Sequence, residues 1–494
     1  MTESTRSKPT LQNWLIIIIA SIGFLFDTYQ LLMTPLAGPQ AIAELLKVPL
    51  NNPQVSEWMG KLLWMTALCG GVFGLLGGWL IDRLGRKFVM ALGIFVYSFS
   101  PVAGAFAHTL DSFIFWRCAT FVGVCIEFVA AITWMSEVFT DKVQKERWLG
   151  ITQAFASLGG VAVTAINVWI VGHAKDLPHL GMPLALGAAD PASWRYLMLT
   201  GLLPAIPIAL MLPFVPESKI WQEKKRAGTL KRPSFTALFS PELRRVTLIT
   251  AGLSACAYGV AFGALQLTPG RIAPGLPNLA EQRKALKPLA DEAKILNAKF
   301  DTTQTGTPER AAALGPIKAN MGKQKPLLDK VKEFGNQAQF FQEMGGLTGR
   351  IVLALLIIIG IGRRTLLRLL QVPGLIVLPL TYLFLYKQDA GVFFWGMAAA
   401  GFVTTSQFSF LGEYLPKVFP LHLRGTGGSF ATNVGGRMIG TGAAFLTANL
   451  VAPKFPGSPY DQMASAAGWV SLGIVVIGVI LGCFLPEPKG ENLD

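Results

Sequence analysis

Long apolar runs separated by short polar connections make up most of this 494-residue chain. A helix that crosses about 30 Å of hydrocarbon needs roughly twenty residues, and twelve of the runs come close to that length. The pattern therefore predicts an all-α membrane protein with twelve transmembrane helices. The runs lie near residues 14–36, 58–81, 88–107, 112–136, 149–171, 195–215, 246–268, 345–361, 369–386, 391–412, 426–450 and 466–485.

The runs form two related sets of six. Glu137 before a basic connection recurs 276 residues later as Glu413, and Gly159 recurs at the same offset as Gly435. Transporters with repeated halves hold the substrate at the interface between the halves and open it alternately to each side, so we expect alternating access. The predicted units are a first six-helix bundle at 1–216, a cytoplasmic linker at 217–245 and a second bundle at 246–494.

Basic residues decide the predicted orientation. Lys and Arg favour the cytoplasmic side in short loops, and they gather in alternate connections and in the linker, for example at Lys224, Lys225 and Arg226. We therefore expect both termini on the cytoplasmic side of a cell membrane, with the lipid bilayer as solvent.

One polar segment, residues 270–343, interrupts the second set of runs and falls on the outer side in this topology. Its Lys, Ala, Glu and Gln content predicts a helical hairpin over the outer mouth. Pro288, Pro308, Pro316 and Pro326 are interpreted as turn formers. Gating, partner binding and simple decoration all remain open as its role.

Composition changes this picture little. Hydrophobic residues are 52% and charged residues 15% of the chain, and the net charge of +14 is spread between apolar runs rather than over a nucleic-acid-binding face. The five Cys and four His lack metal or redox spacing. We find no nucleophile, metal cluster or phosphate loop, so we expect no enzyme activity, no cofactor and no nucleic-acid partner, and we expect a monomer.

The connection after the second run reads Gly78-Trp-Leu-Ile-Asp82-Arg83-Leu-Gly85-Arg86-Lys87. Gly78 allows a neighbouring helix to approach closely, Asp82 suits a helix N-terminus, whose dipole favours an anion, and we expect the basic residues at the cytoplasmic surface. A charged turn that only obeys the positive-inside rule is the alternative.

This segment resembles the G-x-x-x-D-R-x-G-R-K loop of the major facilitator superfamily, and the resemblance implies a conformational lock. Pro216-Glu217-Ser218 and Pro486-Glu487 look like segments of its sugar-porter branch, whereas Asp27 in the first run resembles the organic-acid and proton symporter branches. The seventh run lacks the paired glutamines expected of a sugar porter. By resemblance, Glu137 and Glu413, beside loops that end at Arg147 and Arg424, look like gate salt bridges; surface charge without a gating role is the alternative.

Charged side chains inside predicted spans cost at least about 2.5 to 3.5 kcal/mol near the membrane centre. We predict that Asp27 accepts a proton and that Arg117 is its partner; a static salt bridge that fixes packing is the alternative. Glu127 is a second candidate for the proton or for substrate, or a structural hydrogen-bond acceptor. Arg437 can contact an anionic substrate, because its planar donors suit a carboxylate.

Uncharged polar residues in the spans are candidate cavity liners, although hydrogen bonding between helices explains each one alone. They are Gln153, Asn167, Tyr258, Gln266, Gln407 and Asn433.

The sequence therefore predicts a secondary transporter of a small polar organic solute, either a carboxylate or sugar-like, that moves together with H⁺. A nutrient receptor without net flux and a uniporter are the alternatives.

Overall fold

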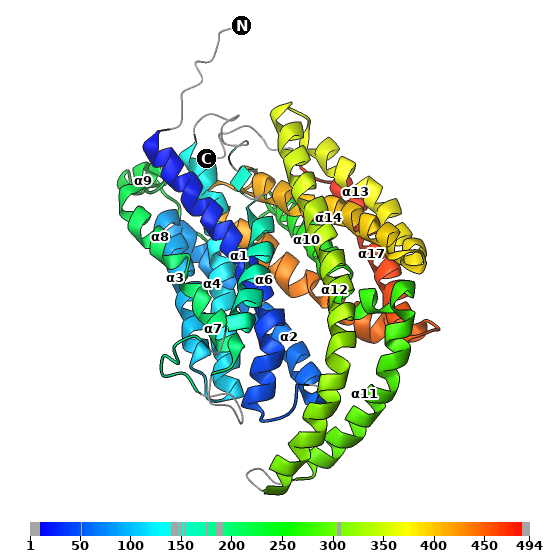
Figure 1. Ribbon diagram of the computed structural model, residues 1–494. Helices are drawn as coiled ribbons and strands as arrows, with labels where there is room; N and C mark the ends of the chain where they lie inside the picture. Colours follow the sequence, from blue (N-terminus) through cyan, green and yellow to red (C-terminus); the bar gives the residue numbers. More distant parts are fainter. Residues whose placement is uncertain are drawn as a thin grey trace.

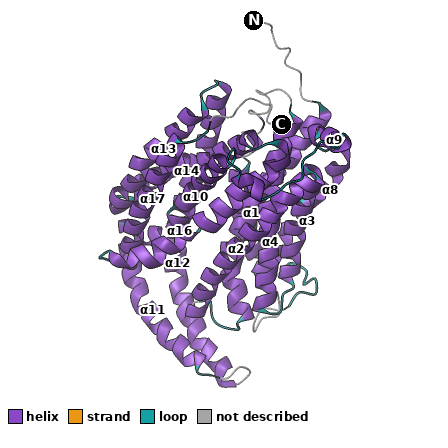
Figure 2. Cartoon of the chain, turned by 180° about the vertical axis from the view of Figure 1, so that it is seen from behind, coloured by secondary structure: helices purple, strands orange, loops and turns teal. Residues whose placement is uncertain are grey.

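The computed structural model describes residues 10–50, 52–139, 148, 151–152, 155–173, 176–183, 191–303 and 308–486, and this part of the chain is helical, without a strand (Figures 1 and 2). The α-helices are α1 (Leu11–Leu45), α2 (Pro53–Leu84), α3 (Arg86–Ala105), α4 (Leu110–Val138), α6 (Ala156–His173), α7 (Ser193–Leu199), α8 (Ala205–Met211), α9 (Lys219–Arg226), α10 (Arg244–Gly263), α11 (Ala280–Asp301), α12 (Pro308–Ile358), α13 (Arg363–Pro379), α14 (Ala390–Val418), α15 (Arg424–Ser429), α16 (Gly442–Phe445) and α17 (Pro459–Cys483).

Ten helices of the described chain are long and apolar enough to cross a membrane, and they match ten of the twelve predicted runs. The predicted tenth span is the single 29-residue helix α14, whose segment Thr404–Gln407 lowers its apolar character. The predicted eleventh span is divided into shorter pieces. The all-helical membrane architecture is thus confirmed, and the count of twelve stays a prediction.

The divided segment is the most irregular part of the fold. After α15, the chain winds as a π-helix from Phe430 to Gly440, continues as α16 and returns to π-helix from Leu446 to Val451. π-Helical turns inside helices occur frequently at functional sites. Arg437 lies on the first of these segments.

The polar insertion forms the predicted helical hairpin of α11 and α12, which projects beyond the bundle in Figure 1. Its second arm is not a separate element, because α12 runs for 51 residues and includes the predicted eighth span. The proline prediction was wrong at three positions: Pro288, Pro316 and Pro326 lie inside helices, and only Pro308 begins one. Each internal proline removes one backbone donor, a loss that the rest of a long helix tolerates.

The two recurring glycines make the same kind of contact in both sets of helices. A Cβ on Gly159 of α6 would overlap the backbone carbonyl of Leu25 on α1, and a Cβ on Gly435 would overlap that of Ala251 on α10. Both positions therefore require glycine for close helix packing.

The first helix begins and the last helix ends at the same end of the molecule (Figure 1). Trp14 at the start of α1 packs on Trp148, with ring centroids 5.0 Å apart. Beyond α17, the carbonyl of Leu485 accepts a 2.7 Å hydrogen bond from Arg364 Nε at the start of α13. Both contacts lie beside connections that are predicted to be cytoplasmic.

Candidate functional site

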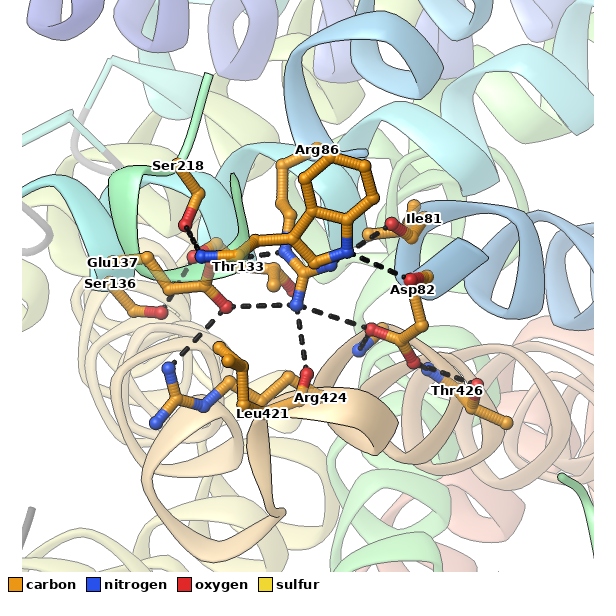
Figure 3. Close-up of polar contacts among 12 residues, drawn as sticks. Ile81, Asp82, Arg86, Thr133, Ser136, Glu137, Ser218, Leu421, Arg424 and Thr426 are labelled. Carbon is orange, nitrogen blue, oxygen red and sulfur yellow. Dashed lines mark hydrogen bonds and ion pairs between the residues drawn. The ribbon is translucent and has the colours of Figure 1, made fainter. Parts of the chain in front are cut away.

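Asp82, in the last turn of α2, joins the two halves and is 1% exposed. Its carboxylate accepts hydrogen bonds from the backbone N–H groups of Gly425 (2.9 Å) and Thr426 (2.7 Å) and from the Thr426 hydroxyl (2.8 Å) (Figure 3). These groups form the N-terminal turn of α15. The predicted contact of Asp82 with a helix N-terminus is confirmed, and the helix belongs to the other half.

Gly78 makes the predicted close approach one turn earlier on α2. A Cβ there would overlap the Gly425 carbonyl oxygen and the Ser429 side chain. The Ser429 hydroxyl also donates a 2.6 Å hydrogen bond to the Gly74 carbonyl. Helices α2 and α15 therefore lie nearly backbone to backbone beside Asp82.

Arg86 was predicted to lie at the cytoplasmic surface, but it is completely buried. Its Nε and Nη2 donate to the Glu137 carboxylate at 3.0 and 3.1 Å, and Nη2 also donates to the Leu421 carbonyl at 2.8 Å (Figure 3). Arg424 reaches the same carboxylate at 3.4 Å. Burial is possible because the carboxylates of Glu137 and Asp82 offset the charge of Arg86, with the Asp82 oxygen at 3.5 Å. We call Asp82, Arg86, Glu137, Arg424 and Thr426 the latch.

Glu217 holds the backbone that carries Arg86. Its carboxylate accepts from the backbone N–H groups of Arg86 (3.0 Å) and Lys87 (3.0 and 3.1 Å) at the start of α3. Gly85 permits the turn, since its φ is +113° and a Cβ would overlap Glu217. Lys87 is half-buried, and its Nζ donates to the Val215 carbonyl at 2.8 Å. Arg83 is exposed and stacks on Trp79.

The second predicted gate residue, Glu413, pairs differently from the prediction. It binds Arg363 at 2.8 Å and Lys417, both within its own half, whereas Arg424 reaches across to Glu137. The position equivalent to Asp82 is Ile359, which has no carboxylate to cap a helix. Arg147 lies outside the described residues, so its predicted pair with Glu137 stays a prediction.

His422 lies between Leu421, whose carbonyl accepts from Arg86, and the latch residue Arg424, without adding a cation. Burial, and then the nearby Lys231 and Lys224, lower the pKa of His422 below its usual value. The imidazole is therefore neutral at neutral pH.

A second polar cluster lies deeper, where Asp27 of α1, Glu127 of α4 and Arg437 meet. Their exposed fractions are 8%, 0% and 7%. The two carboxyl groups lie beside each other, and Arg437 is near enough to attract both, although no ion pair within 4 Å joins them in the described structure. A Cβ on Gly23, one turn before Asp27, would overlap Glu127 Oε1, so the small residue admits the Glu127 side chain to α1. None of the four carboxyl oxygens has a hydrogen bond of good geometry within the described structure.

The predicted ion pair between Asp27 and Arg117 is absent from this conformation. Arg117 Nη2 donates instead to the Gln30 carbonyl (3.0 Å) and the Thr34 hydroxyl (2.5 Å). Thr34 lies seven residues beyond Asp27, about 10 Å along α1. Arg117 thus contacts α1 at a different depth in the membrane from Asp27, and the sequence spacing alone did not show that difference.

Two small cavities lie between the halves. The first is lined by Phe128 of the first half and by residues of α10, α14 and the π-helix: Ser254, Tyr258, Phe408, Leu411, Gly412 and Thr432. The second shares Phe128 and Thr432 and reaches Arg424 of the latch. Each has room for about one water molecule. Neither cavity has room for a substrate in this conformation.

The predicted amide liners are engaged in helix packing. Gln407 Nε2 donates to the Val403 carbonyl at 2.9 Å, and its Oε1 accepts from Gln371 at 3.4 Å. Asn433 Nδ2 donates to Ser429 Oγ at 2.7 Å and to the Cys125 carbonyl at 3.5 Å. Both side chains use their amide donors inside the protein.

The other predicted liners have different surroundings. Tyr258 lines the first cavity and interacts with Arg437. Asn167 is half-buried on α6, and Gln266 is exposed on a short 3₁₀ turn beyond α10, away from both cavities. Gln153 lies outside the described residues.

The aromatic lining of the interface was not predicted from the sequence. Phe121 and Phe128 are seven residues apart on α4, so both share the face that presents Arg437 with rings at 5.4 and 6.0 Å. Phe408 joins them from α14 by an edge contact with Tyr258 at 4.8 Å. The seven-residue spacing of the two rings was a usable signal, but apolar residues in an apolar helix do not stand out from their neighbours.

Comparison with known proteins agrees with this fold. The chain is 26% identical over 211 residues to the niacin transporter NiaP of Acinetobacter baylyi, covering 42% of this chain and 41% of that protein. It is 24% identical over 261 residues to the cis,cis-muconate transport protein of the same species, covering 51% and 57%. The matches therefore span about half the length of these relatives.

A solved structure of the proton:xylose symporter XylE superposes over 98% of both chains, with a TM-score of 0.66 and 15% sequence identity, and so has the same fold. The family model described as Major Facilitator Superfamily matches residues 13–280, which is more than half of the chain. With its fold and its cross-half latch, this chain belongs to the Major Facilitator Superfamily.

Proposed function

We propose that this protein is a secondary transporter that moves an organic carboxylate together with protons by alternating access. The observation that carries the proposal is the meeting of Asp27, Glu127 and Arg437 between the halves. Burying charges in a membrane is costly and usually has a functional reason. An arginine beside two carboxyl groups offers a site for an anion and groups that can take up a proton.

The cation near Asp27 and Glu127 is Arg437 and not Arg117, the partner that the sequence predicted. Arg117 is held by Gln30 and Thr34, so the cation that responds to protonation of Asp27 or Glu127 is Arg437. When a carboxyl group takes a proton, its attraction to Arg437 falls, and the guanidinium becomes available to a substrate carboxylate. Because Arg437 comes from the second half and the carboxyl groups from the first, loading changes the attraction between the halves.

In this proposal, the latch closes one end of the interface between the halves while the other end opens. Asp82, Arg86, Glu137 and Arg424 hold the halves together at one end. By the distribution of Lys and Arg we place that end, and both termini, on the cytoplasmic side of a cell membrane. Opening toward the cytoplasm then requires the latch to separate.

The test is transport by reconstituted full-length protein. Uptake of a panel of radiolabelled carboxylates is measured with and without an inwardly directed proton gradient, for the parent and for Asp27→Asn, Glu127→Gln and Arg437→Gln. We expect Asp27→Asn or Glu127→Gln to abolish gradient-driven accumulation while counterflow continues, and Arg437→Gln to abolish both. Asp111→Asn, at an exposed position in the first turn of α4, is the matched control. Accumulation that survives in both carboxyl variants would contradict proton coupling.

A further inference from the structure

The side chains around Arg437 indicate which class of substrate the site can bind. The guanidinium carbon lies 5.4 Å from the ring centroid of Phe121 and 6.0 Å from that of Phe128, within the range of cation–π contacts. Its Nη1 has no hydrogen-bond acceptor in the described structure, although Arg437 is only 7% exposed. A buried donor without an acceptor is unfavourable, and a carboxylate would satisfy it.

The first cavity extends this site with flat apolar surfaces. Phe128, Tyr258 and Phe408 line it together with the small polar residues Ser254 and Thr432. The Tyr258 ring contacts Phe408 edge-on at 4.8 Å and lies parallel to Phe262 at 6.1 Å. Phe128 belongs to the first half and the other rings to the second, so the gap between them changes when the halves move.

The same region offers little to a polyol. Sugars need several hydrogen-bonding side chains, but the amide donors of Gln407 and Asn433 are already used between helices. Ser254 is the cavity hydroxyl that lacks a hydrogen-bond partner in the described structure. One cation, several rings and few free hydrogen-bond donors around the cavity favour a flat anion.

We infer, on the basis of the proposed function, that the substrate is a planar aromatic or conjugated carboxylate whose carboxylate binds Arg437 and whose plane lies among Phe128, Tyr258 and Phe408. Aromatic contacts of this kind favour a flat ring over a saturated one of similar size by up to about tenfold.

Matched acids test this inference. Binding of benzoate against cyclohexanecarboxylate, and of cis,cis-muconate against adipate, is measured by calorimetry and thermal shift on purified full-length protein at two pH values. We expect at least one flat acid to bind about tenfold more tightly than its saturated partner. Benzyl alcohol, which has the ring without the charge, should not bind.

Variants separate ring from charge. Phe128→Leu and, as a second position, Phe408→Leu should reduce the preference for the flat acid while carboxylate binding remains. If saturated acids bind as well as flat ones, this inference falls and the proposed function stands. If no carboxylate binds or accumulates under a proton gradient, both fall.

A separate observation concerns the hairpin of α11 and α12, which ties the halves at the end opposite the latch. Asn52 Nδ2 donates to both carboxylate oxygens of Asp301, at 3.0 and 3.3 Å. Asn52 also caps α2, and from Asn52 to Asp82 that helix carries the chain about 45 Å. The two ties therefore lie at opposite ends of one helix.

Apolar contacts reinforce this second tie. Phe300 and Ile317 of the hairpin are 0% and 1% exposed and belong to one apolar cluster with Val48, Val55 and Met182 of the first half. Their burial removes a substantial apolar surface from solvent. The tie is thus more than one polar contact.

The two arms of the hairpin are joined to each other and packed on the second half. Asn320 Nδ2 on α12 donates to the Leu289 carbonyl (3.1 Å) and to Glu292 (2.8 Å) on α11, which locks the two arms together. Farther along α12, a Cβ on Gly345 would overlap the Ala398 carbonyl of α14. The hairpin is therefore a rigid extension of the second half.

We propose that this hairpin is a strap that must leave the first half before the interface opens at the end opposite the latch. In a variant without native cysteines, Asn52→Cys with Asp301→Cys is cross-linked by an oxidant or a short dithiol-reactive linker. We expect cross-linked protein in proteoliposomes to lose transport by at least about tenfold, the change for a 1.4 kcal/mol shift, and reductant to restore it.

Leu289→Cys with Asn320→Cys is the control, because it joins the arms of the strap without joining the halves. Its cross-linking should leave transport unchanged. Failure of the first pair to cross-link, or full transport by the cross-linked protein, would overturn the proposal.

Discussion

At the scale of single residues, the latch shows how far a motif predicts a contact. The pattern around Asp82 correctly indicated an anion at a helix N-terminus, because the physics is local to the carboxylate and the helix dipole. It did not identify α15 as that helix, since the contact joins positions 82 and 426. The burial of Arg86 was unexpected for a similar reason: two of its acceptors, Glu137 and the Leu421 carbonyl, come from distant segments.

Glu137 is the residue on which the charges of the latch converge. Replacing it by Gln leaves buried Arg86 and Arg424 without that carboxylate, and removing one partner of a buried pair costs about 3–5 kcal/mol. We expect the latch to open more often. The measurement is maleimide labelling of Thr133→Cys, which lines the cavity beside Arg424, in a cysteine-free background. Labelling from the latch side should rise by about tenfold or more.

The matched control for this change is Glu413→Gln. Glu413 carries the recurring position, but its partners Arg363 and Lys417 lie in its own half. Labelling of Thr133→Cys should therefore stay at the parent level. Equal increases in both variants would mean that the pair across the halves has no special role.

At the scale of elements, helices were predicted well and their irregularities poorly. Hydropathy locates apolar runs, so ten predicted spans coincide with helices long and apolar enough to cross a membrane, and one more coincides with α14. Hydropathy carries no information on which backbone groups form hydrogen bonds with each other. The π-helical segment at Phe430–Gly440 was therefore not predicted. The continuity of α12 across 51 residues was missed because a change from polar to apolar composition looks like a boundary.

The packing of α2 on α15 gives a prediction about Gly78. An added methyl group meets the Gly425 backbone and Ser429, so Gly78→Ala forces the helices apart, at a cost of about 1–3 kcal/mol. We expect a lower Tm in detergent and more labelling of Thr133→Cys from the latch side. Gly60→Ala, on the same helix with open space around it, should keep or raise the Tm, since Ala favours helix by about 0.5–1 kcal/mol. A Gly78 variant that behaves like the Gly60 variant would contradict the close approach.

At the scale of the whole molecule, the two halves share a plan without sharing every function. Gly159 and Gly435 pack on equivalent helices, and Arg363 binds Glu413 as Arg86 binds Glu137. Only the first half carries Asp82, so one latch crosses the interface among the described residues. Duplication was readable from recurring residues, whereas this asymmetry depends on a single substitution whose meaning appears only in three dimensions.

Orientation in the membrane is the remaining whole-molecule prediction. From the short basic loops we predict that the latch lies on the cytoplasmic side and the strap outside. Gly315 in the strap and Gly362 between α12 and α13 are both exposed, with open space around them, so each accepts cysteine in a cysteine-free background. On intact cells a membrane-impermeant maleimide should label Gly315→Cys at once and Gly362→Cys only after permeabilisation. The reverse pattern would place the latch outside, and the proton gradient would then have to act from the opposite face of the Asp27 cluster.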